Sequence, residues 1–154
     1  MKTILMWLTD RLPCRIISDE KGSPYLERYY LFSLLNWTFY VHRFVASDPD
    51  RGLHDHPWSK AYSIVLRNWY LELRPDTVRI VRWFNSLVGS DFHRVILPAN
   101  VEDVWTLFFH KSKRVKLWGF KTEDGYRDYD YGGFIPSEWW KTAKVGHEEP
   151  RRMK

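Results

Sequence analysis

Cysteine is almost absent from this sequence of 154 residues, which contains only Cys14. A single cysteine excludes an internal disulfide and every metal site built from several thiolates. Scarce cysteine is also typical of proteins kept in a reducing compartment. We therefore expect a cytoplasmic protein whose fold does not depend on disulfides.

Long hydrophobic runs are lacking as well. A membrane-spanning helix needs about 20 consecutive apolar residues, and no segment approaches that length. The apolar stretch within residues 1–11 is too short for the core of a signal peptide, and charged residues follow it without a small-residue cleavage site. The sequence predicts neither export nor a membrane partner.

The charge is positive but not concentrated. The formal net charge is +5, from 24 Lys and Arg against 19 Asp and Glu. Nucleic-acid-binding domains gather their basic residues into one patch or stripe. Here these residues are spread along the chain, and the dense cluster at 151–154 is typical of a solvated tail. The pattern does not favour a nucleic-acid partner.

Aromatic residues are abundant, at 18% of the chain, with nine each of Trp, Tyr and Phe. Aromatic side chains favour β-strands and provide large surfaces for a core or a cavity wall. The length fits one domain with a sizeable core. We therefore expect a single domain over residues 1–154.

Short strands separated by turns dominate the pattern along the chain. Apolar residues at helical spacing predict a short helix at 3–12, and the turn-rich segment 19–24 joins a strand at 14–17 to one at 25–32 in a hairpin. The segment from 121 onward is polar, with a short helix possible at 136–144. Further strands are expected at 38–45, 61–66, 69–73, 78–84, 93–97, 104–109 and 114–120. Strands that do not alternate with long helices indicate an all-β sandwich or barrel.

The most informative motif is His54-Asp55-His56. Side chains two residues apart lie on the same face of a strand, so both imidazoles can reach one metal ion at roughly 2.0–2.1 Å. His93 begins another predicted strand and would complete the site if the two strands meet. Asp55 would point to the opposite face and hydrogen-bond a loop. The metal ligands predicted from the sequence are His54, His56 and His93.

These residues resemble the two motifs of the cupin superfamily. Gly52 with the His-x-His pair and the turn near Asn68 resemble the first motif, and Gly89 followed by His93 resembles the second. The resemblance implies a cupin-type jelly-roll β-barrel, or double-stranded β-helix, with a core at about 38–120. It places an N-terminal helix and hairpin at 1–37 and a polar extension at 121–154. Many small cupins are dimers, so the resemblance also implies a homodimer formed through edge strands.

One departure from the cupin pattern affects the chemistry. The family's glutamate ligand would stand at Lys60 or Ala61, and neither can replace it. A lysine ammonium beside a divalent cation is strongly unfavourable. We therefore expect Ala61 in that position, or Lys60 turned away. The site would then consist of three neutral histidines, as in cupin thiol dioxygenases.

A three-histidine site leaves several functions open. We expect one divalent transition metal ion, with Fe, Ni, Mn, Zn and Cu all compatible with imidazole. The first hypothesis is a mononuclear, dioxygenase-like enzyme acting on a small polar molecule. The alternatives are an isomerase or epimerase of a sugar-like substrate, with a histidine as general base, and a non-catalytic cupin that binds a small molecule.

Several other residues have weaker predictions. The candidates for the wall of the substrate pocket are Trp58, Lys60, Tyr62 and Trp105. His42, in the middle of a strand, is expected to be a buried histidine satisfied by hydrogen bonds. His110, which ends a strand beside a lysine, is expected at the surface.

Overall fold

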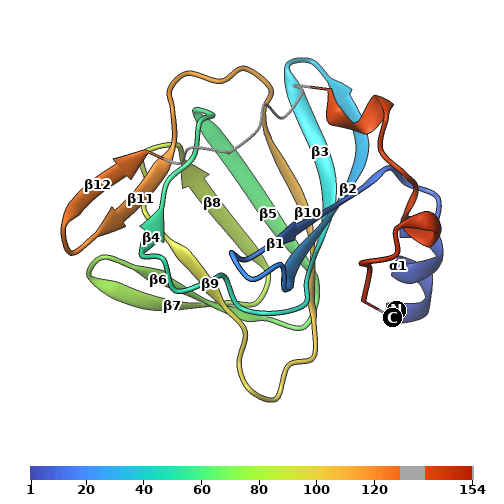
Figure 1. The fold of residues 1–154 in the computed structure, drawn as a ribbon, viewed down its shortest axis with the longest axis horizontal. Coiled ribbons are helices and arrows are strands. Elements are labelled where there is room, and N and C mark those ends of the chain that lie inside the picture. Colours follow the sequence, from blue (N-terminus) through green and yellow to red (C-terminus); the bar gives the residue numbers. More distant parts are fainter. Residues whose placement is uncertain (129–137, 154) are drawn as a thin grey trace.

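The computed structural model describes residues 1–128 and 138–153. It begins with the helix α1 (Lys2–Thr9), after which almost every regular element is a strand (Figure 1). The strands are β1 (Cys14–Ser18), β2 (Pro24–Leu34), β3 (Trp37–Phe44), β4 (Leu53–His54), β5 (Lys60–Arg67), β6 (Tyr70–Arg74), β7 (Thr77–Val81), β8 (Phe84–Val88), β9 (Arg94–Ile96), β10 (Val104–Lys111), β11 (Gly119–Thr122) and β12 (Gly125–Asp128). Two 3-10 helices follow, η1 (Trp139–Lys141) and η2 (Gly146–Glu148). The predicted all-β class is confirmed.

The largest sheet has six strands in the order β1-β2-β3-β10-β5-β8, with antiparallel pairing throughout. Its central strands come from distant parts of the sequence, since β10 lies between β3 and β5. Side chains alternate between its two faces, as the period of two requires. One face therefore lines the interior, while the other faces outward.

Two small sheets lie across from the large one (Figure 1). Their orders are β12-β11-β4 and β7-β6-β9. They are joined at one point, where His54 of β4 pairs with His93 just before β9. The predicted meeting of the two histidine-bearing segments is thus produced by backbone pairing. The finer jelly-roll barrel topology stays a prediction.

The helix α1 covers part of the outer face of the large sheet. Its Leu5 packs in a cluster with Tyr29, Val41 and Trp105. A second cluster, which includes Phe44, Val65 and Val104, fills one end of the interior. A third surrounds Trp58 and borders the cavity described below.

Two strand predictions were wrong. The segment 78–84 forms the end of β7 and the start of β8, because the chain bends at Arg82 and Trp83. The segment 114–118 lies outside the named strands, and its apolar Val115 and Leu117 are 58% and 76% exposed. The chain continues into β11, which pairs with β4 and β12. The segment predicted as a polar extension therefore begins inside a sheet.

The C-terminal segment packs against the N-terminal one. Val145 forms a β-bridge with Pro13, and Arg152 forms an ion pair with Asp10. The basic cluster at 151–154 is therefore partly used inside the molecule. The helix predicted at 136–144 lies partly outside the described residues, and η1 occupies its described portion.

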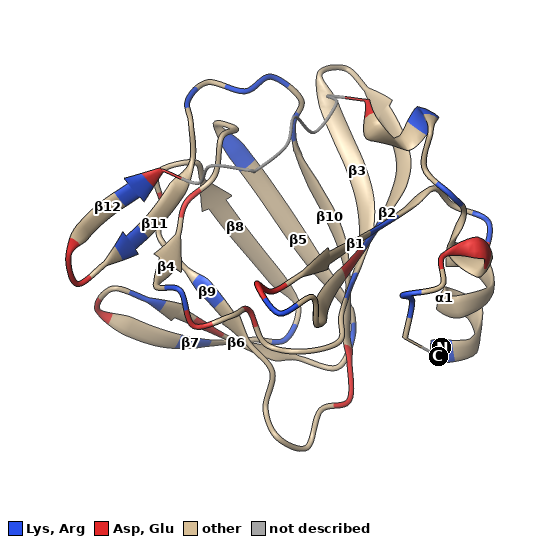
Figure 2. Ribbon diagram, in the orientation of Figure 1, with Lys and Arg blue, Asp and Glu red and all other residues tan. Residues whose placement is uncertain are grey.

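Lysine and arginine are distributed over many strands and loops and are interspersed with acidic residues (Figure 2). In the part of the chain that the structure describes, no helix is both long and apolar enough to cross a membrane.

Candidate metal centre and cavity

Three histidines converge where the small sheets meet. His54 belongs to β4, His56 follows it by two residues, and His93 directly precedes β9. The backbone amides of His54 and His93 each donate to the other's carbonyl oxygen at 2.9 Å. This reciprocal pair fixes the two segments relative to each other, so the histidine side chains are held by regular β-pairing.

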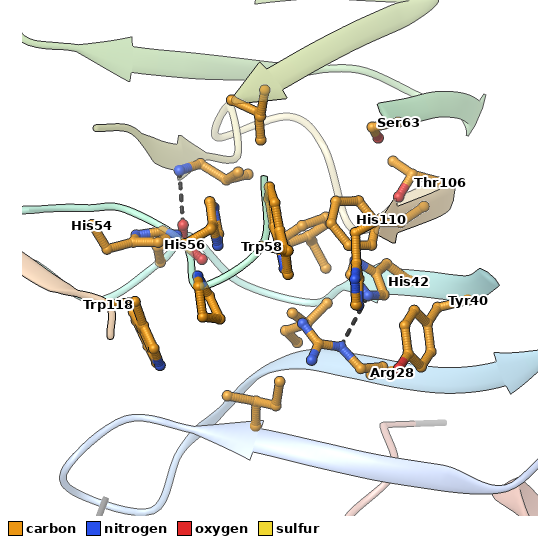
Figure 3. A pocket seen from close by; sticks show the side chains of 18 of the residues that line it. Arg28, Tyr40, His42, His54, His56, Trp58, Ser63, Thr106, His110 and Trp118 are labelled. Atoms are coloured by element: carbon orange, nitrogen blue, oxygen red, sulfur yellow. Dashed lines mark hydrogen bonds between the residues drawn. The ribbon is translucent and has the colours of Figure 1, made fainter. Parts of the chain in front are cut away.

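One ring nitrogen from each histidine lies within 4.8 Å of the other two. The closest pair is His56 Nε2 and His93 Nε2, which are 2.8 Å apart. His93 is 5% exposed, while His54 and His56 are half-buried on the cavity side (Figure 3).

A buried carboxylate sets the orientation of His93. Its Nδ1 lies 3.0 Å from Oε1 of Glu72, which is fully buried in β6. An ionised carboxylate only accepts hydrogen bonds, so Nδ1 carries the proton and donates it to Glu72. In the neutral ring this leaves the lone pair on Nε2, the nitrogen that faces His56. A carboxylate behind a ligand histidine is a common arrangement at metal sites.

Glu72 is itself held by several donors. Asn85 Nδ2 donates to Oε1 at 2.7 Å, and Arg74 Nε donates to Oε2 at 2.9 Å. Burial alone would raise the pKa of Glu72, but hydrogen bonds from His93 and Arg74 outweigh it and lower the pKa to about 2. Glu72 therefore carries a negative charge at neutral pH. The sequence motif gave no indication of this residue.

His56 is positioned by a ring and by a close backbone contact. Its ring stacks on Trp58 with centroids 4.1 Å apart and planes 12° from parallel. Its backbone amide donates to the carbonyl oxygen of Gly89 at 3.0 Å. A Cβ at Gly89 would lie 2.1 Å from the backbone oxygen of Trp58, so only glycine fits there.

Asp55 points away from the three histidines, and the prediction that it hydrogen-bonds a loop is confirmed. Its Oδ1 accepts from the Gly119 amide at 2.8 Å, and its Oδ2 pairs with Lys116. The side chain is 2% exposed. Asp55 thus ties the histidine segment to the start of β11.

His54 and His56 are disposed to stay neutral. Burial, followed by the neighbouring histidines, lowers the pKa of His56 well below its usual range. Burial and His93 do the same for His54. Neutral imidazole is the form that binds metal, so burial keeps these rings ready to act as ligands.

The arrangement fits a divalent transition metal. Two imidazole nitrogens, each about 2.1 Å from one ion and at a right angle, stand about 3 Å apart. The 2.8 Å between His56 Nε2 and His93 Nε2 is close to that value, and a ring nitrogen of His54 lies within 4.8 Å of both histidines' ligand nitrogens. Binding would require the His56 proton to reside on Nδ1. Three protein ligands on one side leave positions open for other ligands.

The histidines lie on the wall of a cavity of about 560 Å³, a volume within the range of small-molecule sites. At the position of the missing glutamate, Ala61 is fully buried in the cluster around Trp58, and Lys60 is exposed. No charged side chain replaces the glutamate there.

Of the predicted wall residues, Trp58 alone lies in the wall. Lys60 points to solvent, because the strand alternation places Ala61 inward. Tyr62 lies on the outer face of the large sheet against Trp37 and Phe109. Trp105 is fully buried beneath α1. The predictions for these three residues were wrong because they depended on which face of each strand is internal.

Sequence reasoning missed the other end of the cavity (Figure 3). His42 is buried as predicted, and its Nε2 accepts a hydrogen bond from Arg28 Nε at 3.0 Å. His110 was expected at the surface but lines the cavity, where its ring stacks near Trp58 and Tyr40. A period-two alignment of β2, β3 and β10 would have placed these side chains on one face.

No family model matches the sequence, and no curated protein does either. Solved structures do match. A cupin-2 domain protein, Rru_A2000 from Rhodospirillum rubrum, has a TM-score of 0.59 at 17% identity, with 74% of this chain and 78% of that chain covered. The iron(II) form of HppE, with the alternative substrate (S)-1-HPP, has a TM-score of 0.55 at 10% identity, with 66% and 57% covered.

A third match is a protein of Ralstonia eutropha described as a candidate mannose-6-phosphate isomerase. It has a TM-score of 0.50 at 16% identity, with 58% of this chain and 87% of that chain covered. That protein is described as an isomerase, whereas HppE is described in its iron(II) form, so structures with this fold do not share one chemistry. What they share with this chain is the fold, which is cupin-like.

Proposed function

We propose that this protein is a mononuclear, metal-dependent enzyme of dioxygenase type that acts on a small polar molecule. The observation that carries the proposal is the convergence of His54, His56 and His93 on the wall of a cavity, with no carboxylate among them. The iron(II) form of HppE, which has a similar fold, adds support.

The residues around the site have separable tasks. Glu72 keeps the lone pair of His93 on Nε2, and Trp58 holds the ring of His56. An ion bound by three neutral imidazoles keeps its full charge, and it would supply Lewis-acid activation and, as iron(II), chemistry with dioxygen. The cavity then serves to orient the substrate beside the open positions.

Metal content provides the first test. Protein purified without added metal should contain close to one transition metal ion per chain, and His54→Ala and His56→Ala should each lose most of it. The matched control is His147→Ala, because this histidine is 60% exposed and lies far along the chain. Equal metal content in all four proteins would refute the metal site.

Dioxygen uptake provides the second test. The iron(II)-loaded protein should consume dioxygen with at least one substrate from a panel of small thiols, enols and diketones, and the zinc-loaded protein should not. Uptake that is the same for wild type and His54→Ala would rule out chemistry at this site. Metal binding without any uptake across the panel would favour the non-catalytic binding module.

An isomerase or epimerase is the second candidate, supported by His110. Its Nδ1 donates to the carbonyl oxygen of Lys111 at 2.7 Å, so Nε2 can accept a proton inside the cavity. However, burial lowers the pKa of His110 to about 4, although the backbone hydrogen bond opposes this. A general base works best with a pKa near the operating pH. This histidine would be a weak base, so we rank the isomerase second.

A further inference from the structure

We propose that the end of the cavity away from the three histidines is an anion subsite built on Arg28, so that the substrate carries a carboxylate attached to an apolar, planar body. This proposal rests on the metal-dependent function proposed above, and it names the chemical class of that enzyme's substrate. The Arg28 subsite can be tested in the absence of metal.

Arg28 has donors left for a ligand. It belongs to β2, and its neighbour across the sheet is His42 of β3. Its Nε donates to His42 Nε2 at 3.0 Å, and its guanidinium lies 5.4 Å from the centre of the Tyr40 ring. No carboxylate forms an ion pair with Arg28 among residues 1–128 and 138–153. A guanidinium has five N–H donors, and since His42 accepts from Nε–H, the four N–H groups of the terminal nitrogens remain without a carboxylate partner among the described residues.

His42 directs those donors. Burial, followed by Arg28, lowers the pKa of His42 well below its usual range, so the ring is neutral and its Nε2 accepts. The hydrogen bond to Nε fixes the plane of the guanidinium, and no hydrogen bond from its two terminal nitrogens is found among the described residues. These nitrogens form the fork that binds a carboxylate through two parallel hydrogen bonds.

The cavity wall carries more positive than negative charge. Its acidic residues are Asp48 and Glu138; Glu138 is exposed, and the Asp48 carboxylate accepts from the Val95 amide at 2.8 Å. Burial raises the pKa of Asp48. The basic residues of the wall are Arg15, Arg28, Arg51 and Arg114. Such a wall attracts an anion and disfavours a cation.

The wall between the two ends is a series of nearly parallel rings. From His56 the series passes to Trp58, then His110, Tyr40 and Trp139. Successive centroids are 4.1, 5.5, 5.6 and 6.3 Å apart, and successive planes lie 12°, 15°, 23° and 11° from parallel. An aromatic wall favours an apolar, planar body, whereas a sugar would need many polar partners. The substrate class is therefore an aromatic or unsaturated carboxylic acid.

The test measures binding of two probes of equal shape by titration calorimetry. 3-Phenylpropanoate carries the carboxylate, and 3-phenylpropanamide is its neutral counterpart. Wild-type protein, both as purified and after removal of metal with EDTA, should bind the acid at least tenfold more tightly than the amide. Arg28→Gln should weaken acid binding roughly 10- to 100-fold, the usual effect of losing hydrogen bonds between charged groups, and should leave amide binding unchanged.

Two controls make the result specific. Arg82→Gln removes an exposed arginine that does not line the cavity, and it should bind the acid like wild type. Arg28→Lys keeps the charge but loses the fork, so its affinity should fall between those of wild type and Arg28→Gln. The proposal is overturned if Arg28→Gln binds the acid like wild type, if acid and amide bind equally, or if neither probe binds.

The two proposals fail separately. If His54→Ala loses metal but keeps the acid affinity of the EDTA-treated protein, both stand. If metal content is the same in wild type and His54→Ala while the Arg28 effect persists, the metal proposal fails and the anion subsite stands. If the metal is lost but Arg28→Gln has no effect, the subsite fails and the metal site stands.

Discussion

At the scale of single residues, the pair of His93 and Glu72 gives the site its chemical character. Glu72 is fully buried and negatively charged, and it accepts the Nδ1 proton of His93 at 3.0 Å. This carboxylate provides the negative charge missing from the three histidine ligands, but it would act on the metal only through the imidazole ring of His93. The metal would thus be bound by neutral ligands, one of them made more basic by hydrogen bonding.

Replacing Glu72 with glutamine should weaken metal binding about 10- to 100-fold, the usual effect of losing a carboxylate behind a ligand histidine. Competition with a chromogenic chelator measures the affinity, and circular dichroism checks that the variant is folded. Glu148→Gln is a matched control on an exposed side chain. Unchanged affinity in Glu72→Gln would show that this carboxylate has no influence on the metal.

The sequence was sufficient to predict the three histidines but not the residue behind them. The strand period of two places the side chains of His54 and His56 on one face. The position of His93 after Gly89 resembles the second cupin motif. The position of Glu72 behind His93 depends on how β6 pairs with β9, where Glu72 lies opposite Val95. That register is set by tertiary packing, which no local pattern reveals.

At the scale of elements, the turn after β8 brings Gly89 against the histidine segment. The Gly89 carbonyl accepts from His56, and its amide donates to Ser59 at 3.1 Å. The close approach needs a residue without a Cβ, since the added atom would overlap the backbone of Trp58. The position of His56 therefore depends on this glycine.

Gly89→Ala should destabilise the protein by roughly 3–4 kcal/mol, at the upper end of the range for single substitutions. Urea denaturation followed by tryptophan fluorescence measures the change. Gly22→Ala is the comparison: Gly22 has a φ of +84° but open space around it, so the cost should be only about 1–2 kcal/mol of backbone strain. Similar losses in the two variants would mean that the Gly89 contact is easily relieved.

Strand positions were predicted better than strand partners. Four predicted strands lie inside the observed strands or extend beyond them by one residue. They are 14–17, 25–32, 38–45 and 104–109, which correspond to β1, β2, β3 and β10. The order β3-β10-β5 joins segments that are distant in sequence, which hydrophobic periodicity cannot specify. For the same reason, Tyr62 and Trp105 were placed in the cavity although their side chains are on the outer face.

At the scale of the whole molecule, a buried ion network connects strands β2 and β3 to the C-terminal segment. Arg43 of β3, 2% exposed, pairs with Glu27 and Asp103, both fully buried. The Met153 amide donates to Glu27 Oε1 at 2.7 Å, so the C-terminal segment joins the same network.

Arg43→Ala should lower the free energy of unfolding by roughly 3–5 kcal/mol, because it leaves Glu27 buried without its cation and removes one cation from Asp103, which still pairs with Arg67. Chemical denaturation monitored by circular dichroism measures the loss. Arg82→Ala, on an exposed arginine, should change the same quantity by less than about 0.5 kcal/mol. A loss in Arg43→Ala as small as in that control would argue against a structural role for the network.

Acid should destabilise the metal-free protein in two separate pH ranges. The pKa values of His42, His54 and His56 are lowered by burial, so below about pH 6.5 the unfolded chain takes up protons that the folded protein does not. Stability should therefore fall as the pH drops below that value, by up to about 1.4 kcal/mol per pH unit for each histidine. The lowered pKa of Glu72 adds a loss only below about pH 4.5, extending toward pH 2.

Urea unfolding of EDTA-treated protein at pH 7.5, 6.5 and 5.5 tests the first range. For three histidines with an unfolded pKa of about 6.5, the free energy of unfolding should fall by about 1 kcal/mol between the first two values and by about 3 kcal/mol between the second and the third. Equal stability at pH 7.5 and 5.5 would show that the buried histidines take up protons in the folded state.

The most direct test of the three-histidine centre is an anomalous diffraction map from crystals of protein purified without added metal. The account predicts one peak, at roughly 2.0–2.2 Å from a ring nitrogen of each of His54, His56 and His93, with the Nδ1 of His93 still bonded to Glu72. A map with no peak there, and with His56 still hydrogen-bonded to His93 through their Nε2 atoms, would contradict it.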